Sequence, residues 1–299
     1  MRRTFQGSLV AMVTPFHDGK VDEGKLRELV EFHIANGTDG LVPCGTTGES
    51  PTLSHAEQKR VVEIVIQQAR GRIPVVPGTG SYSTADVIEM TRHVAHAGAS
   101  GALIVTPYYN KPTQQGLYEH YRAIAQAVPD LPLIVYNIQG RTAVNVETDT
   151  LARLAQIPNI VGVKEASGNV SQMCEICRAV PDGFLVLSGD DALTLPLMAV
   201  GGRGIISVAS NEIPAEMVQM VELAERNDFA AARQVHARIL PLMSINFIES
   251  NPGPVKAAMA AMGLLEEVFR LPMVAPRAES KEKILQVLKE LGALKGAMV

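Results

Sequence analysis

The sequence is poor in cysteine, with three in 299 residues. Three cysteines build no disulfide framework, so we expect a cytoplasmic protein whose thiols stay reduced. The net charge is −4 at pH 7 and Lys and Arg form no cluster, which argues against nucleic-acid and membrane-surface partners. The sequence also lacks an apolar run near the roughly 20 residues of a membrane span. Its start lacks the long apolar stretch of a secretory signal, and none is expected.

Residues that bind metals are sparse as well. Cys174 and Cys177 form a C-x-x-C pair, which could be a redox pair or half a zinc site. No second pair accompanies them, so we interpret them as two thiols on one helix. His93 and His96 share a helix face without an evident third ligand, which favours a solvated face. We therefore predict neither a metal nor a cofactor.

The residues that are abundant indicate a large α/β core. Hydrophobic residues make up 46% of the chain and charged residues 19%. Apolar segments rich in Val, Ile and Leu, typical of strands buried on both faces, are predicted as strands at 8–13, 40–43, 74–79, 101–106, 133–137, 160–164, 184–188 and 204–208. Amphipathic stretches between them are predicted as helices at 22–36, 54–70, 84–97, 114–128, 147–155, 170–180, 191–200 and 215–226.

Eight consecutive βα units indicate a closed (β/α)8 barrel, the TIM barrel, rather than an open sheet. We assign residues 1–226 to this catalytic barrel. Residues 227–299 are predicted to form a C-terminal three-helix extension, with helices at 229–247, 254–262 and 279–291. No low-complexity linker precedes them, so we expect the extension to pack on the barrel.

Lys164 is the most informative residue, because it closes the apolar strand at 160–164. Burial disfavours the charged form of an amine, and a neutral amine is a nucleophile that forms Schiff bases with ketones. The alternative, equally weighted on the strand alone, is a lysine that extends out of the strand end into solvent.

Polar residues follow several other predicted strands. In a barrel, chemistry collects at the carboxyl ends of the strands. Those ends carry the loop 45–50 (Gly-Thr-Thr-Gly-Glu-Ser), the pair Tyr108 and Tyr109, then Tyr136, and Arg141. These residue types fit a reaction in which a lysine attacks a ketone and a phenol transfers protons. Hydroxyl and backbone N–H groups would hold one carboxylate and an arginine a second.

Four motifs resemble signatures of the pyruvate-dependent class I aldolase/lyase family: the segments 45–50, 108–112, 136–137 and 163–169. The resemblance runs from about residue 7 to the C-terminal helices. It implies a (β/α)8 barrel with a helical extension, a homotetramer built as a dimer of dimers, and cofactor-free Schiff-base chemistry. Within the family, the motifs are most similar to members that condense pyruvate with L-aspartate 4-semialdehyde in lysine and diaminopimelate biosynthesis.

The resemblance also implies the roles of catalytic residues. Lys164 forms the imine with pyruvate, and Tyr136 is the general acid and base beside it. Thr47 links Tyr136 to Tyr109, which reaches in from the neighbouring subunit. The residues implied to bind substrates are Thr46 and Thr47 for the pyruvate carboxylate, Arg141 for the semialdehyde carboxylate, and the backbones of Gly189 and Ile206.

The chain departs from the family pattern in two places. The first is the loop that carries Arg141, where Gln139 replaces a proline and Ala143 a glycine, which removes easy access to positive φ. The second is the site at which lysine inhibits some members, matched here by Ser50, Pro51, His55, Gln58, Gly80, Tyr82, Asp86 and Tyr108. Gln58 stands where histidine is common, Tyr82 where asparagine is common, and Asp86 is shorter than the usual glutamate. We expect weak lysine inhibition or none.

Two alternatives remain open. One is a sister enzyme on the same Schiff-base framework, namely N-acetylneuraminate lyase or a keto-deoxy sugar-acid aldolase or dehydratase. Arg141 argues against it, because a polyhydroxy substrate needs neutral hydrogen-bonding partners. The other is a non-catalytic barrel that binds a small keto acid. That barrel would have a broken proton relay, whereas Thr47, Tyr109, Tyr136 and Lys164 are all present.

Overall fold

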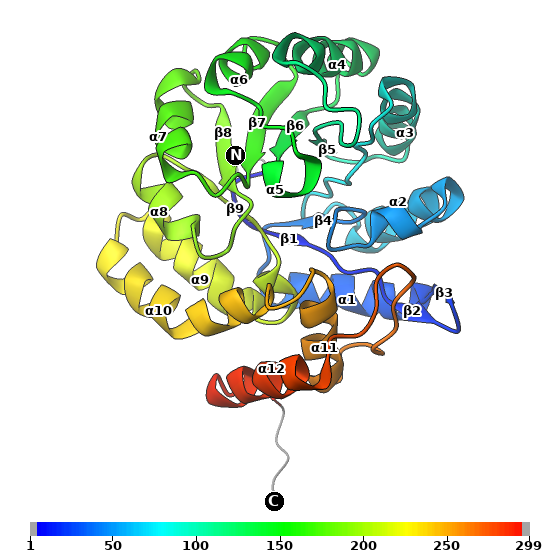
Figure 1. Ribbon diagram of the computed structural model, residues 1–299, viewed down its shortest axis with the longest axis vertical. Coiled ribbons are helices and arrows are strands. Elements are labelled where there is room, and N and C mark those ends of the chain that lie inside the picture. The colour runs from blue at the N-terminus through cyan, green and yellow to red at the C-terminus, as the bar shows by residue number, and fades with distance from the viewer. Residues whose placement is uncertain (1–4, 295–299) are drawn as a thin grey trace, which may run out of the picture.

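The computed structural model describes residues 5–294 and forms a barrel of parallel strands ringed by helices (Figure 1). Seven strands follow one another around the barrel in the order β4-β1-β9-β8-β7-β6-β5. Their bounds are β1 Gly7–Ala11, β4 Gly40–Val42, β5 Ala102–Val105, β6 Leu133–Asn137, β7 Ile160–Glu165, β8 Leu185–Ser188 and β9 Gly204–Ser207. The predicted α/β class and TIM-barrel architecture are therefore confirmed.

The segment 74–79 completes the ring between β4 and β5, although it is not the continuous strand that we predicted. It makes single parallel bridges, from Val75 to Leu41 and from Gly78 to Leu103. Pro74 and Pro77 carry no N–H group, so the segment lacks the ladder donors of a regular strand at these two positions. Its remaining groups still pair on both sides, for example Val76 N with Leu41 O at 2.8 Å.

The predicted helices are present, with ends that differ from the predicted ones by at most three residues. Their bounds are α1 Glu23–Ala35, α2 His55–Ala69, α3 Thr84–His96, α4 Gln114–Ala127, α6 Thr148–Leu154, α7 Val170–Ala179, α8 Thr194–Ala199 and α9 Pro214–Glu225. Ser54 and Glu57 form a complete capping box at the start of α2. Shorter elements that the sequence did not indicate are β2 Phe16–His17, β3 Lys20–Val21, α5 Gln139–Thr142 and the 3-10 turns Ser50–Thr52 and Ala209–Asn211.

The C-terminal extension contributes α10 Phe229–Ile245, α11 Gly253–Ala261 and α12 Ala278–Glu290, which lie along one side of the barrel (Figure 1). One apolar cluster joins Met217 of α9 to Ile239 of α10 and Ile284 of α12, so the extension packs on the barrel. The boundary at residue 226 stays a prediction, and residues 295–299 of the predicted extension lie outside the described residues. Within 5–294, no helix has both the length and the apolar character needed to cross a membrane.

Candidate active site

Lys164 and Tyr136 lie side by side at the carboxyl ends of neighbouring strands. They are register partners of β7 and β6, and the Lys164 amine stands 4.4 Å from the centre of the Tyr136 ring. Lys164 is only 5% exposed, so it does not extend into bulk solvent. Both residues line one cavity at the mouth of the barrel. The arrangement puts an amine and a phenol within reach of one small molecule.

Gly189, which follows β8, makes room for the stem of Lys164. A Cβ atom at this position would lie 3.0 Å from Cε and 3.1 Å from Cγ of Lys164, and 2.6 Å from the Cβ of Ala166. The backbone N–H of Gly189 donates a hydrogen bond to Glu165 O at 2.8 Å. The absence of a side chain here is therefore a requirement for the position of the lysine.

A buried polar network fixes the strand ends behind Lys164. Because side chains alternate along a strand, Glu165 points to the opposite face of β7 from Lys164. Glu165 Oε2 accepts a hydrogen bond from Asn137 Nδ2 at 2.9 Å, and its Oε1 accepts from Ser167 N at 2.7 Å. Asn137 Oδ1 in turn accepts from Val146 N at 2.9 Å. The network ties the ends of β6 and β7 to the loops that follow them.

The loop 45–50 presents its two threonines to the same cavity as Lys164. Thr47 is buried, and the Thr14 hydroxyl donates to Gly48 O at 2.6 Å. Cys44 and Glu49, on either side of the loop's centre, adopt positive φ angles of 56° and 52°. Non-glycine residues seldom adopt this conformation, so the surrounding contacts must hold the loop in place.

Two residues of the extension, Asn251 and Phe247, also line this cavity, and the sequence reasoning missed both. Asn251 Nδ2 donates to Thr47 Oγ1 at 3.0 Å, and Asn251 O accepts from Arg141 Nη2 at 3.3 Å. The only local signal is an asparagine in the proline-rich run 251–254 between two helices. Nothing in that run indicates which strand end it meets.

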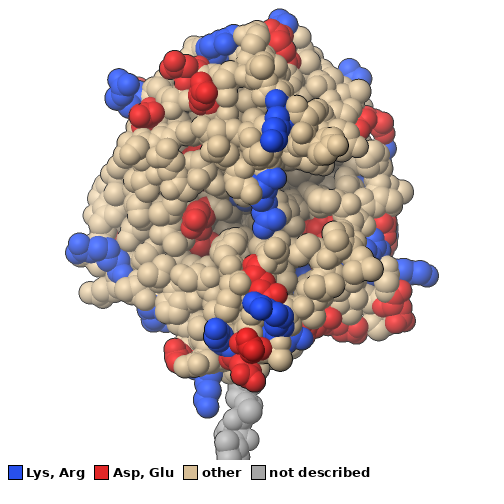
Figure 2. All heavy atoms as spheres, viewed as in Figure 1, with Lys and Arg blue, Asp and Glu red and all other residues tan. Residues whose placement is uncertain are grey.

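Arg141 stands on the short helix α5 at the rim of the cavity, exposed to solvent. Ala143 ends this helix with φ of 58°, and its N–H donates to Gln139 O at 2.8 Å. The alanine thus adopts the positive φ that we expected it to disfavour. Figure 2 shows a hollow near the middle of this face with basic side chains beside it. A cation at the rim is suited to an anionic ligand.

Two predicted site residues, Tyr109 and Ile206, do not line the cavity. Tyr109 is 93% exposed and has φ of 70°. Ile206, by contrast, is fully buried among barrel-core residues that include Tyr136 and Leu187, and Val208 on the same segment lines the cavity. The predicted roles of Tyr109 and Ile206 stay predictions.

A second hollow extends from Tyr136 and Arg141. It is lined by all the residues predicted for a lysine site, namely Ser50, Pro51, His55, Gln58, Gly80, Tyr82, Asp86 and Tyr108. Tyr82 is 53% exposed, and its ring meets that of Tyr108 edge-on with centres 5.5 Å apart. Burial raises the pKa of Tyr108. Gln58 Nε2 donates a hydrogen bond to Ser50 O at 2.9 Å.

The residues considered for metal binding do not gather. Within the described part of the chain, no three His, Cys, Asp or Glu side chains are placed to hold a metal ion. Cys174 is exposed on α7, Cys177 is half-buried, and burial raises the pKa of Cys177 to about 11. His93 Nε2 lies 3.1 Å from Glu63 Oε1.

Comparisons with known proteins agree over almost the whole chain. The Dihydrodipicolinate synthetase family matches residues 4–291. A relative from Syntrophus aciditrophicus, named 4-hydroxy-tetrahydrodipicolinate synthase, is 53% identical and covers 97% of this chain and 99% of its own length. One from Koribacter versatilis with the same name is 54% identical over 98% of each chain. The crystal structure of dihydrodipicolinate synthase from Aquifex aeolicus has a TM-score of 0.96 and 47% identity, covering 97% of this chain and 99% of its own.

Proposed function

This chain belongs to the dihydrodipicolinate synthetase family, and on that premise we propose that it is a lyase of the class I aldolase type. It condenses pyruvate with L-aspartate 4-semialdehyde to 4-hydroxy-tetrahydrodipicolinate, a step of lysine and diaminopimelate biosynthesis. The observation that carries the proposal is the buried amine of Lys164 beside the Tyr136 ring, in a cavity rimmed by Arg141.

The covalent step begins at Lys164. Its amine attacks the ketone carbon of pyruvate, and the resulting carbinolamine loses water to give an imine. The imine draws electrons from the neighbouring methyl group, so that a base can remove a proton and leave an enamine. Tyr136 is the group next to Lys164 that moves these protons. The enamine carbon then attacks the aldehyde, and the amine of the semialdehyde displaces Lys164 and closes the ring.

The two carboxylates are bound at opposite sides of the reacting atoms. The hydroxyl groups of Thr46 and Thr47, with nearby backbone N–H groups, hold the carboxylate of pyruvate. Arg141 holds that of the semialdehyde, since its planar guanidinium can form two parallel hydrogen bonds to a carboxylate. Gly189 and Ile206 bound the pocket through their backbones. The fit of Gly189 against the Lys164 stem supports this placement.

The active unit is a homo-oligomer, with a dimer of dimers as the assembly we favour. The exposed Tyr109 supports this view, because an aromatic side chain that its own chain leaves bare is suited to an interface. In the dimer, Tyr109 enters the neighbour's site and joins Thr47 and Tyr136 in the proton relay. The reaction needs no metal or cofactor, because the imine itself withdraws the electrons. We assign the activity to the cytoplasm, as the reduced cysteines suggest.

The test is a substrate comparison with purified protein. Pyruvate plus aspartate semialdehyde should give rapid turnover, while N-acetylneuraminate and keto-deoxy sugar acids should give little. Arg141 supports this order, because a polyhydroxy chain offers the guanidinium no second carboxylate. Faster turnover of a sugar acid would favour the sister-lyase alternative. Binding of pyruvate without any turnover would favour the non-catalytic barrel.

A further inference from the structure

The chain holds a second buried lysine that the proposed reaction does not use. Lys256 of α11 is 0% exposed, and its amine donates to three oxygen atoms. They are Glu49 Oε1 at 2.6 Å, Val268 O at 2.6 Å and Thr14 O at 3.1 Å. Burial lowers the pKa of Lys256, and the Glu49 carboxylate opposes that effect. An ammonium group is matched here by as many acceptors as it has protons.

The partner of Lys256 belongs to the loop that carries Thr46 and Thr47. The Glu49 side chain is completely buried, and its backbone N–H donates to Thr46 O at 3.1 Å. A second connection passes through Thr14, which accepts from Lys256 and donates to Gly48 O at 2.6 Å. Lys256 therefore reaches the backbone on the C-terminal side of Thr47 by two routes.

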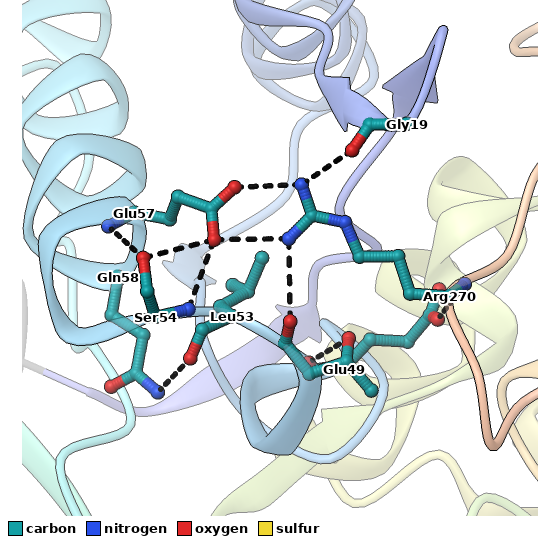
Figure 3. A network of polar contacts seen from close by, with 8 residues as sticks. Gly19, Glu49, Leu53, Ser54, Glu57, Gln58 and Arg270 are labelled. Carbon is teal, nitrogen blue, oxygen red and sulfur yellow. Dashed lines mark hydrogen bonds and ion pairs between the residues drawn. The ribbon is translucent and has the colours of Figure 1, made fainter.

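The segment 268–270 contacts both members of the Lys256–Glu49 ion pair, through Val268 O and Arg270 N. Phe16 lies between two cations, with its ring centre 4.4 Å from Lys256 Nζ and 4.5 Å from Arg270 Cζ. Figure 3 shows Arg270 extending from this segment to Glu57 at the start of α2, with Glu49 beside it. The Arg270 guanidinium binds both carboxylate oxygens of Glu57, at 3.0 and 2.6 Å. The C-terminal extension thus contacts the loop 45–50 through Lys256, and the start of α2 through Arg270.

We propose that Lys256 is a positioning residue, which acts through Glu49 to hold the loop 45–50 in the conformation that binds the substrate carboxylate. The proposal rests on the proposed function, since it assigns that loop to pyruvate. Glu49 has φ of 52°, a conformation that a non-glycine residue keeps only when its surroundings impose it. The Glu49 carboxylate accepts from Lys256 Nζ at 2.6 Å and, at a longer 3.4 Å, from Arg270 N. Without the ion pair, the threonine hydroxyls lose their fixed placement beside Lys164.

A purely structural role predicts a different outcome from a positioning role. A buried ion pair can often be replaced by uncharged residues of similar volume without loss of stability. Changing only one partner leaves an unpaired buried charge, so both must change together. The double variant Lys256→Met/Glu49→Gln keeps the volume of the pair and removes both charges. In this variant we expect the loop 45–50 to stay mispositioned even if the stability of the fold matches that of the wild type.

The experiment titrates pyruvate, traps the imine with borohydride and measures the fraction of modified chains by intact mass. In the double variant we expect the half-saturating pyruvate concentration to rise about tenfold, because small misplacements of binding groups cost that much or more. The KM for the semialdehyde should change much less. The matched control is Lys281→Met/Glu267→Gln, which removes a partly exposed ion pair of the same extension and should behave as wild type.

Each outcome decides a separate question. Absence of trapping in the wild type overturns the proposed function, whatever Lys256 does. A folded double variant that traps pyruvate at wild-type concentrations overturns the positioning role. If the double variant does not fold, Glu49→Asp takes its place, because it keeps the charge and withdraws the carboxylate by one methylene. An unchanged half-saturation in that variant also overturns the proposal, and a rise specific to pyruvate supports it.

Discussion

The side-chain amide of Asn251 donates a 3.0 Å hydrogen bond to the hydroxyl of Thr47, across 204 positions of the sequence. Through this contact, the C-terminal extension forms part of the cavity that Lys164 and Tyr136 line, rather than merely covering the barrel. The donated bond also leaves the Thr47 proton free to point toward another acceptor. Orientation of a hydroxyl in this way suits a residue proposed to pass protons between two tyrosines.

Asn251→Ala should lower kcat by about tenfold to a hundredfold, because the Thr47 hydroxyl loses the donor that orients it within the proton relay. Asn251→Asp keeps the size of the side chain but not its N–H donor, so it should lose a comparable amount. Steady-state rates for both variants test this. Full activity in Asn251→Asp would show that the donated hydrogen bond is unimportant.

Lys164→Ala should fold and lose nearly all activity, because removal of the amine removes the covalent route itself. Incubation of the wild-type protein with pyruvate and borohydride should add one adduct per chain, and peptide mapping should locate it at Lys164. Lys281→Met, which alters a surface lysine, is expected to retain the adduct. An adduct at another lysine would contradict the assignment.

Arg141→Ala should raise the KM for the semialdehyde about 10- to 150-fold, the range expected for the loss of charge-assisted hydrogen bonds. The KM for pyruvate should move much less. Arg141→Lys should restore only part of the loss, because a single ammonium group lacks the planar fork of a guanidinium. Equal changes in both KM values would identify Arg141 as structural and favour a sister enzyme.

A mixture of Tyr109→Phe and Lys164→Ala chains should regain activity that neither variant has alone. Each hybrid dimer contains one site with an intact lysine and a tyrosine supplied by the partner. With random exchange in equal amounts, about a quarter of wild-type activity should return. Subunit exchange is verified by native mass spectrometry. No recovery after exchange would mean that Tyr109 acts within its own chain.

L-Lysine should inhibit the enzyme weakly or not at all. The Tyr82 ring lies edge-on against Tyr108 in the hollow where a ligand would need space. Tyr82→Asn should restore a side chain able to bind a carboxylate and increase lysine sensitivity about 5- to 150-fold. Initial rates at saturating pyruvate across a lysine titration measure this. Half-inhibition of the wild type at sub-millimolar lysine would show that the site tolerates Tyr82.

The elements of the barrel could be predicted from the sequence because their signals are local. A strand covered on both faces is apolar along its length, as at Leu133–Asn137, whose predicted and observed bounds coincide. The capping box of Ser54 and Glu57 spans only four positions. The segment 74–79 was harder, because its apolar pattern indicates a strand while its two prolines prevent a regular ladder.

Within the candidate site, the sequence by itself determined that Lys164 and Tyr136 lie at strand ends, because both belong to apolar runs that form the neighbouring strands β7 and β6. The tertiary structure alone decided that Asn251 meets Thr47 and that Lys256 meets Glu49. Both pairs join the extension to the loop 45–50, which follows β4 and lies more than 200 positions away in the sequence. No periodicity or capping pattern encodes such a contact, because it depends on how α10 and α11 pack across the barrel, and that packing is a property of the whole core.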